Sequence, residues 1–203
     1  SKIIENKIKN NSYEVNIENI NNIGIFEGNI LPTKSSIIPT YICDEVEDNT
    51  GLIGKVVLTN LGLYSKKQAF HRDIKELTIF KKNKLIAFSS SVKIVTTLKL
   101  HNINTIVSHQ VYNGLNYLHL EALYMKMPLI HNSTYLKKYG YYYPEFNVEK
   151  GAKVLKKAIN HHKDNLEKYN KLCEECIYNY SINNPKNING YKKLIEKELK
   201  YNN

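Results

Sequence analysis

The chain has no tryptophan and only three cysteines, Cys43, Cys173 and Cys176, among its 203 residues. So low and odd a cysteine count argues against a disulfide framework and indicates a reducing, cytoplasmic compartment. Cys173 and Cys176 have C-x-x-C spacing, but the surrounding segment is rich in Lys and Glu and has a helical pattern. A redox pair is expected at a strand-to-helix turn, and a zinc site requires two further ligands, so we expect neither at these cysteines.

Long apolar segments are also missing. No run approaches the roughly 18 apolar residues of a membrane-spanning helix, and the N-terminal segment lacks the apolar core of a signal peptide. We therefore expect no membrane span. The chain does not begin with Met, which is typical of a domain cut from a longer protein or of a processed chain.

The net charge is +10, and most of it comes from lysine. A positive balance of this size fits either an anionic partner such as nucleic acid or a solvated, Lys-rich surface. Lys, Asn, Ile and Tyr are all residues of AT-rich codons, and the lysines from Lys150 to Lys200 alternate with glutamates on helical patterns. Composition therefore favours the solvated surface, and we do not expect a nucleic-acid partner.

Short apolar runs alternate with helical patterns along most of the chain. This alternation predicts an α/β fold, a Rossmann-like parallel sheet with helices on both faces. We expect residues 1–22 to be a tail or an edge strand, 23–165 to be the Rossmann-like domain, and 166–203 to be C-terminal helices packed on it. The expected strands are Ile23–Glu27, Gly54–Asn60, Leu85–Ser89, Thr105–Ser108 and Pro128–Ile130, and the expected helices include Ser36–Val46, Ser65–Leu77, Ser91–Leu100, Leu115–Met125, Ser133–Lys138, Val148–His162, Leu166–Tyr180 and Tyr191–Leu199.

The segment from Thr105 to Asn132 is the most informative part of the sequence. A short strand leads into a polar loop that contains His109, Gln110, Asn113 and Asn116, and a helix follows Gly114. The start of a helix offers free backbone N–H groups and the positive end of the helix dipole, which together favour phosphate. The sequence therefore predicts a nucleotide-type ligand at this loop.

Two charged residues fit the same ligand. Lys34 lies in the loop between the first strand and its helix, where it either pairs with a phosphate or is simply solvated. Glu121 lies among apolar residues of the helix after the polar loop, where it either accepts the hydroxyls of a ribose or marks the water boundary of an amphipathic helix. The sequence has neither G-x-G-x-x-G after the first strand nor a Walker A motif, so the standard dinucleotide and P-loop sites are absent.

These motifs resemble the C-terminal, donor-binding domain of a GT-B fold glycosyltransferase. Retaining enzymes of that group carry a G-R-x-x-x-x-K loop after the first strand, and Asn29 and Lys34 have the spacing of its Arg and Lys. They also carry two Glu eight positions apart, the second within E-A-x-x-x-x-x-P, which the segment from Glu121 to Pro128 matches. Leu85–Phe88 resembles their V-x-F strand before the base-binding loop, here Ser89–Ser91.

The resemblance is closer to a poorly characterised bacterial glycosyltransferase-like family, with the pattern FEPN, SHQ, NPLNYL, PLVHNS and YYYP. This chain has FEGN, SHQ, NGLNYL, PLIHNS and YYYP in the same order, over residues 23 to 165. Two departures affect the expected site: Asn29 stands where the group has Arg, and Asn113 stands where it has the first Glu, which usually faces the sugar.

The resemblance implies a glycosyltransferase domain that binds a nucleotide-diphospho-sugar as its donor substrate, with no cofactor and no metal. It implies an unknown acceptor and an N-terminal acceptor domain that is missing here, so that this domain alone need not be active. A non-catalytic nucleotide- or nucleic-acid-binding module is the alternative. The catalytic residues implied are His109 and Asn113, and the nucleotide-sugar-binding residues are Asn29, Lys34, Ser90, Gln110, Gly114, Leu115, Asn116 and Glu121.

Overall fold

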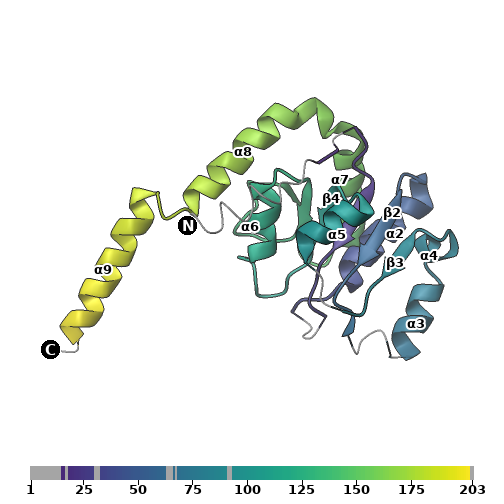
Figure 1. Ribbon diagram of the computed structural model, residues 1–203, viewed down its shortest axis with the longest axis horizontal. Coiled ribbons are helices and arrows are strands. Elements are labelled where there is room, and N and C mark those ends of the chain that lie inside the picture. Colours follow the sequence, from purple (N-terminus) through teal and green to yellow (C-terminus); the bar gives the residue numbers. More distant parts are fainter. Residues whose placement is uncertain are drawn as a thin grey trace.

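The computed structural model describes residues 15–16, 18–29, 33–62, 66, 68–90 and 93–201. A six-stranded sheet of order β3-β2-β1-β4-β5-β6 forms the middle of the molecule (Figure 1), and every neighbouring pair is parallel. This is the strand order of a Rossmann-type sheet, in which the order reverses between β1 and β4. The α/β fold expected from the sequence is therefore confirmed.

The five strands expected from apolar runs all exist and lie in this one sheet. The strands are β1 (Asn22–Ile25), β2 (Lys55–Leu58), β3 (Leu85–Ala87), β4 (Thr105–Val107), β5 (Leu129–His131) and β6 (Tyr141–Tyr142). The helices are α2 (Ile37–Thr50), α3 (Gln68–Lys75), α4 (Thr78–Lys81), α5 (Ile94–His101), α6 (Tyr117–Tyr124), α7 (Val148–His161), α8 (Leu166–Asn179) and α9 (Pro185–Tyr201), with a 3-10 turn η2 (Lys163–Asn165) before α8.

Helices cover the sheet from both faces, and each face has its own apolar cluster. On one face α2 and α7 pack together, and Ile42, Val46 and Leu155 meet β1 and β2. On the other face α5, α6 and α8 meet the sheet through residues such as Leu98 and Leu123. Because both faces are covered, the strands β1, β2, β4 and β5 are largely buried and read as continuous apolar runs, which explains why the sequence pattern identifies them.

Local sequence signals fix where several helices begin and end. Pro39 lies in the first turn of α2, where a missing N–H costs little, and Gly51 ends that helix in the left-handed conformation at φ 68°. The side chains of Asn116 and Asn147 cap α6 and α7 by accepting hydrogen bonds from Leu118 N and Lys150 N.

Two local expectations were wrong, and one strand was not expected. Residues 135–138 form consecutive turns where a short helix over Ser133–Lys138 was expected, and α9 begins at Pro185 rather than at Tyr191. Tyr141 and Tyr142 form the edge strand β6. The tail or edge strand expected over residues 1–22 lies largely outside the described residues.

The two C-terminal helices differ in how they meet the domain. Tyr169, Cys173 and Cys176 of α8 are buried in the second apolar cluster, and the Tyr169 hydroxyl donates to Met127 O at 2.6 Å. Burial raises the pKa of each of these two thiols to about 12, which fits inert packing residues. In contrast, α9 projects away from the body of the molecule (Figure 1), and its side chains from Ile188 to Leu199 are exposed. Within the described residues no helix is both long and apolar enough to cross a membrane.

Candidate functional site

The candidate site lies where the strand order reverses, beyond the carboxyl ends of β1 and β4. Ligands of open parallel sheets bind in the crevice at this switch point. The loops that follow the two strands are joined directly: Lys34 and Gln110 form an isolated antiparallel bridge, and Val111 N donates to Thr33 O at 3.0 Å. The structure thus brings Lys34 beside the polar loop of the sequence motif, although 76 positions separate Lys34 from Gln110.

The buried side chain of Glu27 connects these two loops. It follows β1, it is 1% exposed, and its carboxylate accepts three hydrogen bonds from residues that follow β4. Oε1 accepts from Ser108 Oγ at 2.6 Å and from His109 N at 3.1 Å, and Oε2 accepts from Gln110 Nε2 at 2.5 Å. Burial raises the pKa of Glu27 to about 7, although these hydrogen bonds and the charge of Lys34 act in the opposite direction.

The side chain of Gln110 lies between Glu27 and Asn113 and is hydrogen-bonded to both. Its side-chain oxygen accepts a hydrogen bond of 3.1 Å from Asn113 Nδ2, and its backbone N–H and C=O pair with the side chain of Asn132 at 2.8 Å each. Both ends of the Gln110 amide are therefore occupied inside the protein. Asn113 is partly exposed, and its Oδ1 accepts no hydrogen bond from the described residues.

His109 is held in one orientation by Tyr143 and covered by Phe146. The Tyr143 hydroxyl lies 2.9 Å from His109 Nδ1 and donates to Ser108 O at 3.3 Å, and the Phe146 ring lies 4.7 Å from the imidazole. Burial lowers the pKa of His109 to about 4, so the ring is neutral at pH 7. Its Nε2 is buried and has no hydrogen-bond partner among the described residues.

Two further buried histidines, His119 and His131, lie close to Ser108. His119 of α6 is fully buried, its Nε2 lies 2.9 Å from Ser108 Oγ, and its ring centroid lies 5.5 Å from that of His131. Burial lowers the pKa of His119 to about 3 and that of His131 to about 4. Both rings are therefore neutral, and within the described residues no group of three His, Cys, Asp or Glu side chains is arranged to hold a metal ion.

Asn29 organises the loop that carries Lys34. It adopts a left-handed conformation with φ 53°, which Asn tolerates better than most residues. Its Nδ2 donates to Glu27 O and Thr59 O, and its Oδ1 accepts from both the N–H and the hydroxyl of Ser36. All of the Asn29 amide is thus engaged in holding the loop against β2 and α2.

The expected phosphate-binding turn lies at the start of α6. Gly114 is packed so closely that a Cβ there would lie 2.5 Å from the Tyr135 ring, and its carbonyl accepts a hydrogen bond from the Ser133 hydroxyl. Leu115 is exposed, and Asn116 caps the helix with its side chain.

The remaining two expected residues make no hydrogen bond with Glu27 or Gln110 in the part of the chain that the structure describes. Glu121 is on the exposed side of α6, and partial desolvation raises its pKa. Ser90 is exposed in the loop after β3, two strands away from β1, and its carbonyl accepts from Asn60 N at 3.3 Å. The structure therefore groups His109, Gln110, Asn113 and Lys34 and leaves Ser90 apart from them.

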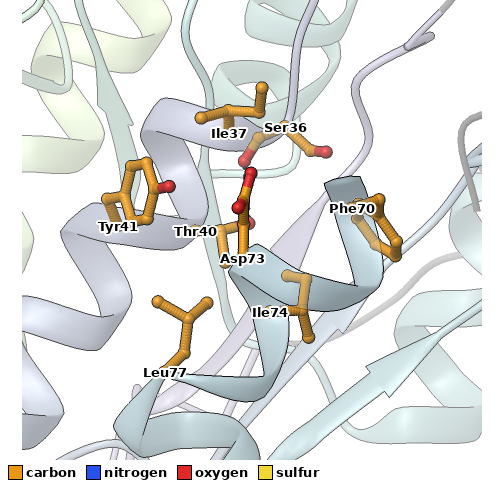
Figure 2. A pocket seen from close by; sticks show the side chains of 8 residues that line it. All are labelled: Ser36, Ile37, Thr40, Tyr41, Phe70, Asp73, Ile74 and Leu77. Carbon is orange, nitrogen blue, oxygen red and sulfur yellow. Dashed lines mark hydrogen bonds between the residues drawn. The ribbon is translucent and has the colours of Figure 1, made fainter. Parts of the chain in front are cut away.

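A small hollow lies beside the first turn of α2 (Figure 2). Its volume is about 30 Å³, and it lies between α2 and α3. A volume of this size holds about one or two water molecules and not a nucleotide. Ser36 belongs both to the wall of this hollow and to the Asn29 network.

A protein-family model described as "Protein of unknown function (DUF2827)" matches residues 2–195. The chain belongs to the DUF2827 family. No curated protein matches the chain.

Several solved structures resemble the chain, and some of them are named as glycosyltransferases. They include TarM (TM-score 0.63, 19% identity), a glycosyltransferase from Rickettsia africae ESF-5 (0.63, 16%) and the pneumococcal O-GlcNAc transferase GtfA in complex with UDP and GlcNAc (0.53, 11%). The matches cover 90%, 96% and 87% of this chain but only 35%, 52% and 35% of those proteins. At these identities the likeness shows a shared fold, and the chain spans about a third to a half of the length of these structures.

The sequence interpretation missed three residues that build the site: Glu27, Asn132 and Tyr143. Glu27 belongs to the FEGN motif, Asn132 to PLIHNS and Tyr143 to YYYP, so each was inside a motif that carried the resemblance. A charged residue directly after a buried strand, as in Phe26-Glu27, was a usable signal, because a buried carboxylate needs hydrogen-bond donors.

Proposed function

We propose that this chain is the donor-binding half of a GT-B glycosyltransferase and that it binds a nucleotide-diphospho-sugar at the β1/β4 switch point. The observation that carries the proposal is the bridge between Lys34 and Gln110. It sets a cationic side chain beside the loop that leads into the start of α6, and these two elements come from separate motifs of the resemblance. A Lys beside a helix start is a favourable pair of groups for a diphosphate.

In this proposal each part of the site has a different task. Lys34 and the N–H groups of Gly114, Leu115 and Asn116 stabilise the negative charge that builds on the diphosphate as it departs. Glu121 accepts the hydroxyls of the ribose, and Ser90 contacts the base from the loop after β3.

The neighbourhood of His109 and Asn113 suits the sugar. His109 is neutral and offers an unpaired ring nitrogen, and Asn113 offers an unpaired oxygen within the described region. Both atoms accept hydrogen bonds, and sugar hydroxyls are donors that match them. Phe146 lies over His109 and has to move, or admit the ligand at its edge, before a hydroxyl can reach the nitrogen.

The surface charge gives no separate support for a nucleic-acid partner. Several exposed lysines are paired with glutamates, including Lys126 with Glu174 and Lys138 with Glu175. Pairs of this kind reduce the positive field that would attract a phosphate backbone.

A thermal-shift screen tests the proposal. The chain is heated with UDP, GDP, ADP, their sugar conjugates and the bare nucleosides. We expect one diphosphate family to raise the melting temperature, with the nucleotide sugar at least as effective as the nucleotide. A chain whose melting temperature no nucleotide changes is not a donor-binding domain.

A further inference from the structure

The hydrogen bonds around Glu27 run in one fixed direction. An ionised carboxylate can only accept, so Ser108 Oγ, His109 N and Gln110 Nε2 must all donate to it. Because Gln110 uses its nitrogen toward Glu27, its oxygen points to Asn113 and accepts from Asn113 Nδ2. Asn113 has then used its nitrogen, and its oxygen is the atom that remains for a ligand.

We propose that Glu27 is a positioning residue that acts through Gln110 to turn the oxygen of Asn113 toward the sugar of the donor. This inference rests on the proposed function and extends it, because it names a residue outside the ligand contacts and assigns it a task. The side chain at position 113 stands where the resembling enzymes have a glutamate. With its oxygen turned outward, Asn113 presents a hydrogen-bond acceptor, as a glutamate would.

Above its pKa of about 7 the Glu27 carboxyl is ionised, and its surroundings then leave no other arrangement. His109 N is a backbone donor and cannot be reversed, so Oε1 must remain an acceptor. The charged or titratable groups that face Glu27 are Lys34 from its own loop, His109 after β4, His119 of α6 through Ser108, and Tyr143 after β6. Gln110 is 5% exposed and both ends of its amide are occupied, so it transmits orientation and does not itself offer an atom to the ligand.

The variant Glu27→Gln reverses this chain of hydrogen bonds with a side chain of nearly the same size. The new amide keeps its oxygen toward Ser108 and His109, so its nitrogen faces the nitrogen of Gln110. Two donors repel each other, and Gln110 has to turn its oxygen toward residue 27 and its nitrogen toward Asn113. Asn113 then turns as well and presents its nitrogen to the ligand.

The double variant Glu27→Gln/Gln110→Glu restores the original direction. The nitrogen at position 27 donates to the new carboxylate at position 110, and that carboxylate again accepts from Asn113 Nδ2. The single variant Gln110→Glu serves as the second control, because it sets two carboxylates against each other, of which only one can be charged.

The experiment compares the wild type and these three variants by calorimetric titration with UDP, UDP-N-acetylglucosamine, GDP and GDP-mannose. We expect Glu27→Gln to bind each bare nucleotide within about twofold of the wild type and to bind the preferred nucleotide sugar about two- to tenfold more weakly, the range of one neutral hydrogen bond. The double variant should regain the sugar affinity. Equal weakening of nucleotide and nucleotide sugar in Glu27→Gln, or a double variant that fails to recover, overturns the proposal.

The melting temperatures of the same four proteins without ligand separate this proposal from the proposed function. Each single variant should melt lower than the wild type, and the double variant should recover most of the loss, because residues 27 and 110 are coupled through one hydrogen bond. A wild type that binds none of the four ligands refutes the donor site, whereas additive losses in the double variant refute the hydrogen-bond chain itself.

Discussion

The hydroxyl of Tyr143 and Nδ1 of His109 lie 2.9 Å apart, and this contact decides which ring nitrogen of His109 carries the proton. Tyr143 has one hydroxyl proton and donates it to Ser108 O, which can only accept. We infer that the hydroxyl oxygen accepts from His109 Nδ1–H. The other nitrogen, Nε2, is left unprotonated and is an acceptor.

Replacing Tyr143 with phenylalanine should release this constraint. Ser108 O and His109 Nδ1 both lose a partner in a buried place, so we expect the free energy of unfolding to fall by about 1–3 kcal/mol. Nitrogen-15 NMR of the imidazole should show mainly the Nδ1–H form in the wild type and a mixture of both forms in Tyr143→Phe.

Tyr142→Phe is the matched control for this change. The Tyr142 hydroxyl makes no hydrogen bond with the described residues, and the ring is partly exposed beside His131. We expect this variant to keep the Nδ1–H form of His109 and to lose little stability. A wild-type His109 that carries its proton on Nε2 contradicts the inferred direction of the Tyr143 contact.

The buried histidines should make the protein sensitive to mild acid. Burial lowers the pKa of His109, His131 and His162 to about 4 and that of His119 to about 3, whereas an unfolded histidine titrates near its ordinary value of 6.5. Between these values the unfolded chain binds more protons than the folded one, so stability rises with pH up to about 6.5 and is lost on acidification below it.

Glu27 acts in the opposite direction over nearly the same range. Its pKa is raised from 4.5 to about 7, so the folded state binds the extra proton and this contribution to stability falls as pH rises from 4.5 to 7. Four histidines outweigh one carboxyl, and the net difference of nearly three protons gives a slope near pH 5.5 of about 4 kcal/mol per pH unit. Urea unfolding at pH 5, 6 and 7 measures it. The free energy of unfolding should change more steeply with pH in Glu27→Gln and less steeply in His162→Gln. A free energy of unfolding that is constant from pH 5 to 7 would refute the assignment of neutral, buried rings.

The sequence predicted the fold well because the strands of a covered parallel sheet are apolar on both sides. Val56, Val57 and Leu58 of β2, for example, are all fully buried and form an unbroken apolar run. The strand β6 was missed since it is a two-residue edge strand of partly buried tyrosines. The short segment 133–138 was wrongly expected to be a helix, because Leu136 is its one buried apolar residue and six residues are too few to show a period.

The site was harder to predict, since its hydrogen bonds join residues that are far apart in sequence. The three donors to Glu27 come from positions 81, 82 and 83 residues later, and only the pairing of β1 with β4 brings them together. The sequence motif identified His109, Gln110 and Asn113 as a group. It did not reveal that the side-chain amides of Gln110 and Asn29 form hydrogen bonds within the protein. The ligand roles of the residues in this group remain predictions.

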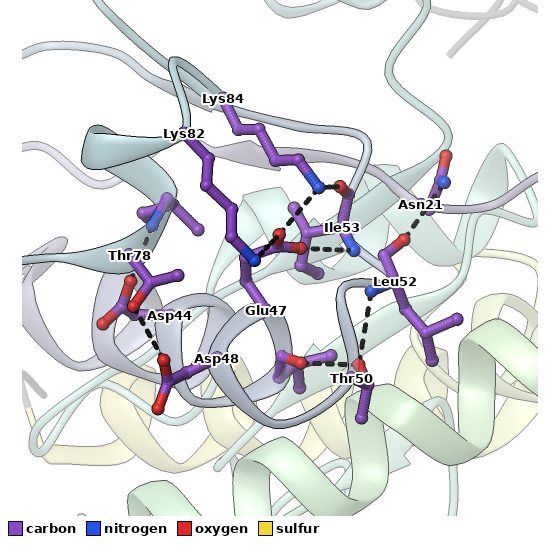
Figure 3. A network of polar contacts seen from close by, with 12 residues as sticks. Asn21, Asp44, Glu47, Asp48, Thr50, Leu52, Ile53, Thr78, Lys82 and Lys84 are labelled. Carbon is purple, nitrogen blue, oxygen red and sulfur yellow. Dashed lines mark hydrogen bonds and ion pairs between the residues drawn. The ribbon is translucent and has the colours of Figure 1, made fainter.

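A buried ion pair at the opposite end of the sheet should contribute to stability independently of the site. The Glu47 side chain is completely buried, and its carboxylate pairs with Lys84 at 2.8 Å and Lys82 at 2.9 Å (Figure 3), while Ile53 N also donates to it at 3.1 Å. Burial would raise the pKa of Glu47, but these contacts outweigh it and lower the pKa, so the stability they contribute is lost as acid protonates this carboxyl.

The two lysines of this ion pair should not be equivalent. Lys84 is less exposed than Lys82, with 24% against 48% of its side chain accessible, and its ammonium also donates to Ile53 O at 2.5 Å. We expect Lys84→Met to lower the free energy of unfolding by about 2–4 kcal/mol and Lys82→Met by less than about 1 kcal/mol. Chemical denaturation of both variants at pH 7 measures the difference, and equal losses would show that exposure does not set the strength of these pairs.

Lys34 and Glu121 should affect ligand binding in different ways if the donor site is as proposed. Lys34 lies in the loop bridged to Gln110 and would contact the diphosphate, so Lys34→Ala should weaken a nucleoside diphosphate by about ten- to a hundredfold and leave the bare nucleoside almost unchanged. Glu121 lies on α6 and would contact the ribose, so Glu121→Gln should weaken nucleoside and diphosphate by similar factors. Added salt should reduce the contribution of Lys34 more strongly, because partly exposed charges are screened.

Titration calorimetry with UDP, GDP and their nucleosides measures all of these affinities. Lys99→Ala and Glu149→Gln, which change exposed residues of α5 and α7, are the matched controls. If nucleotides bind the folded wild type, Lys34→Ala and Glu121→Gln with equal affinity, the ligand occupies another part of the molecule. The diphosphate contact of Lys34 and the ribose contact of Glu121 are then both wrong.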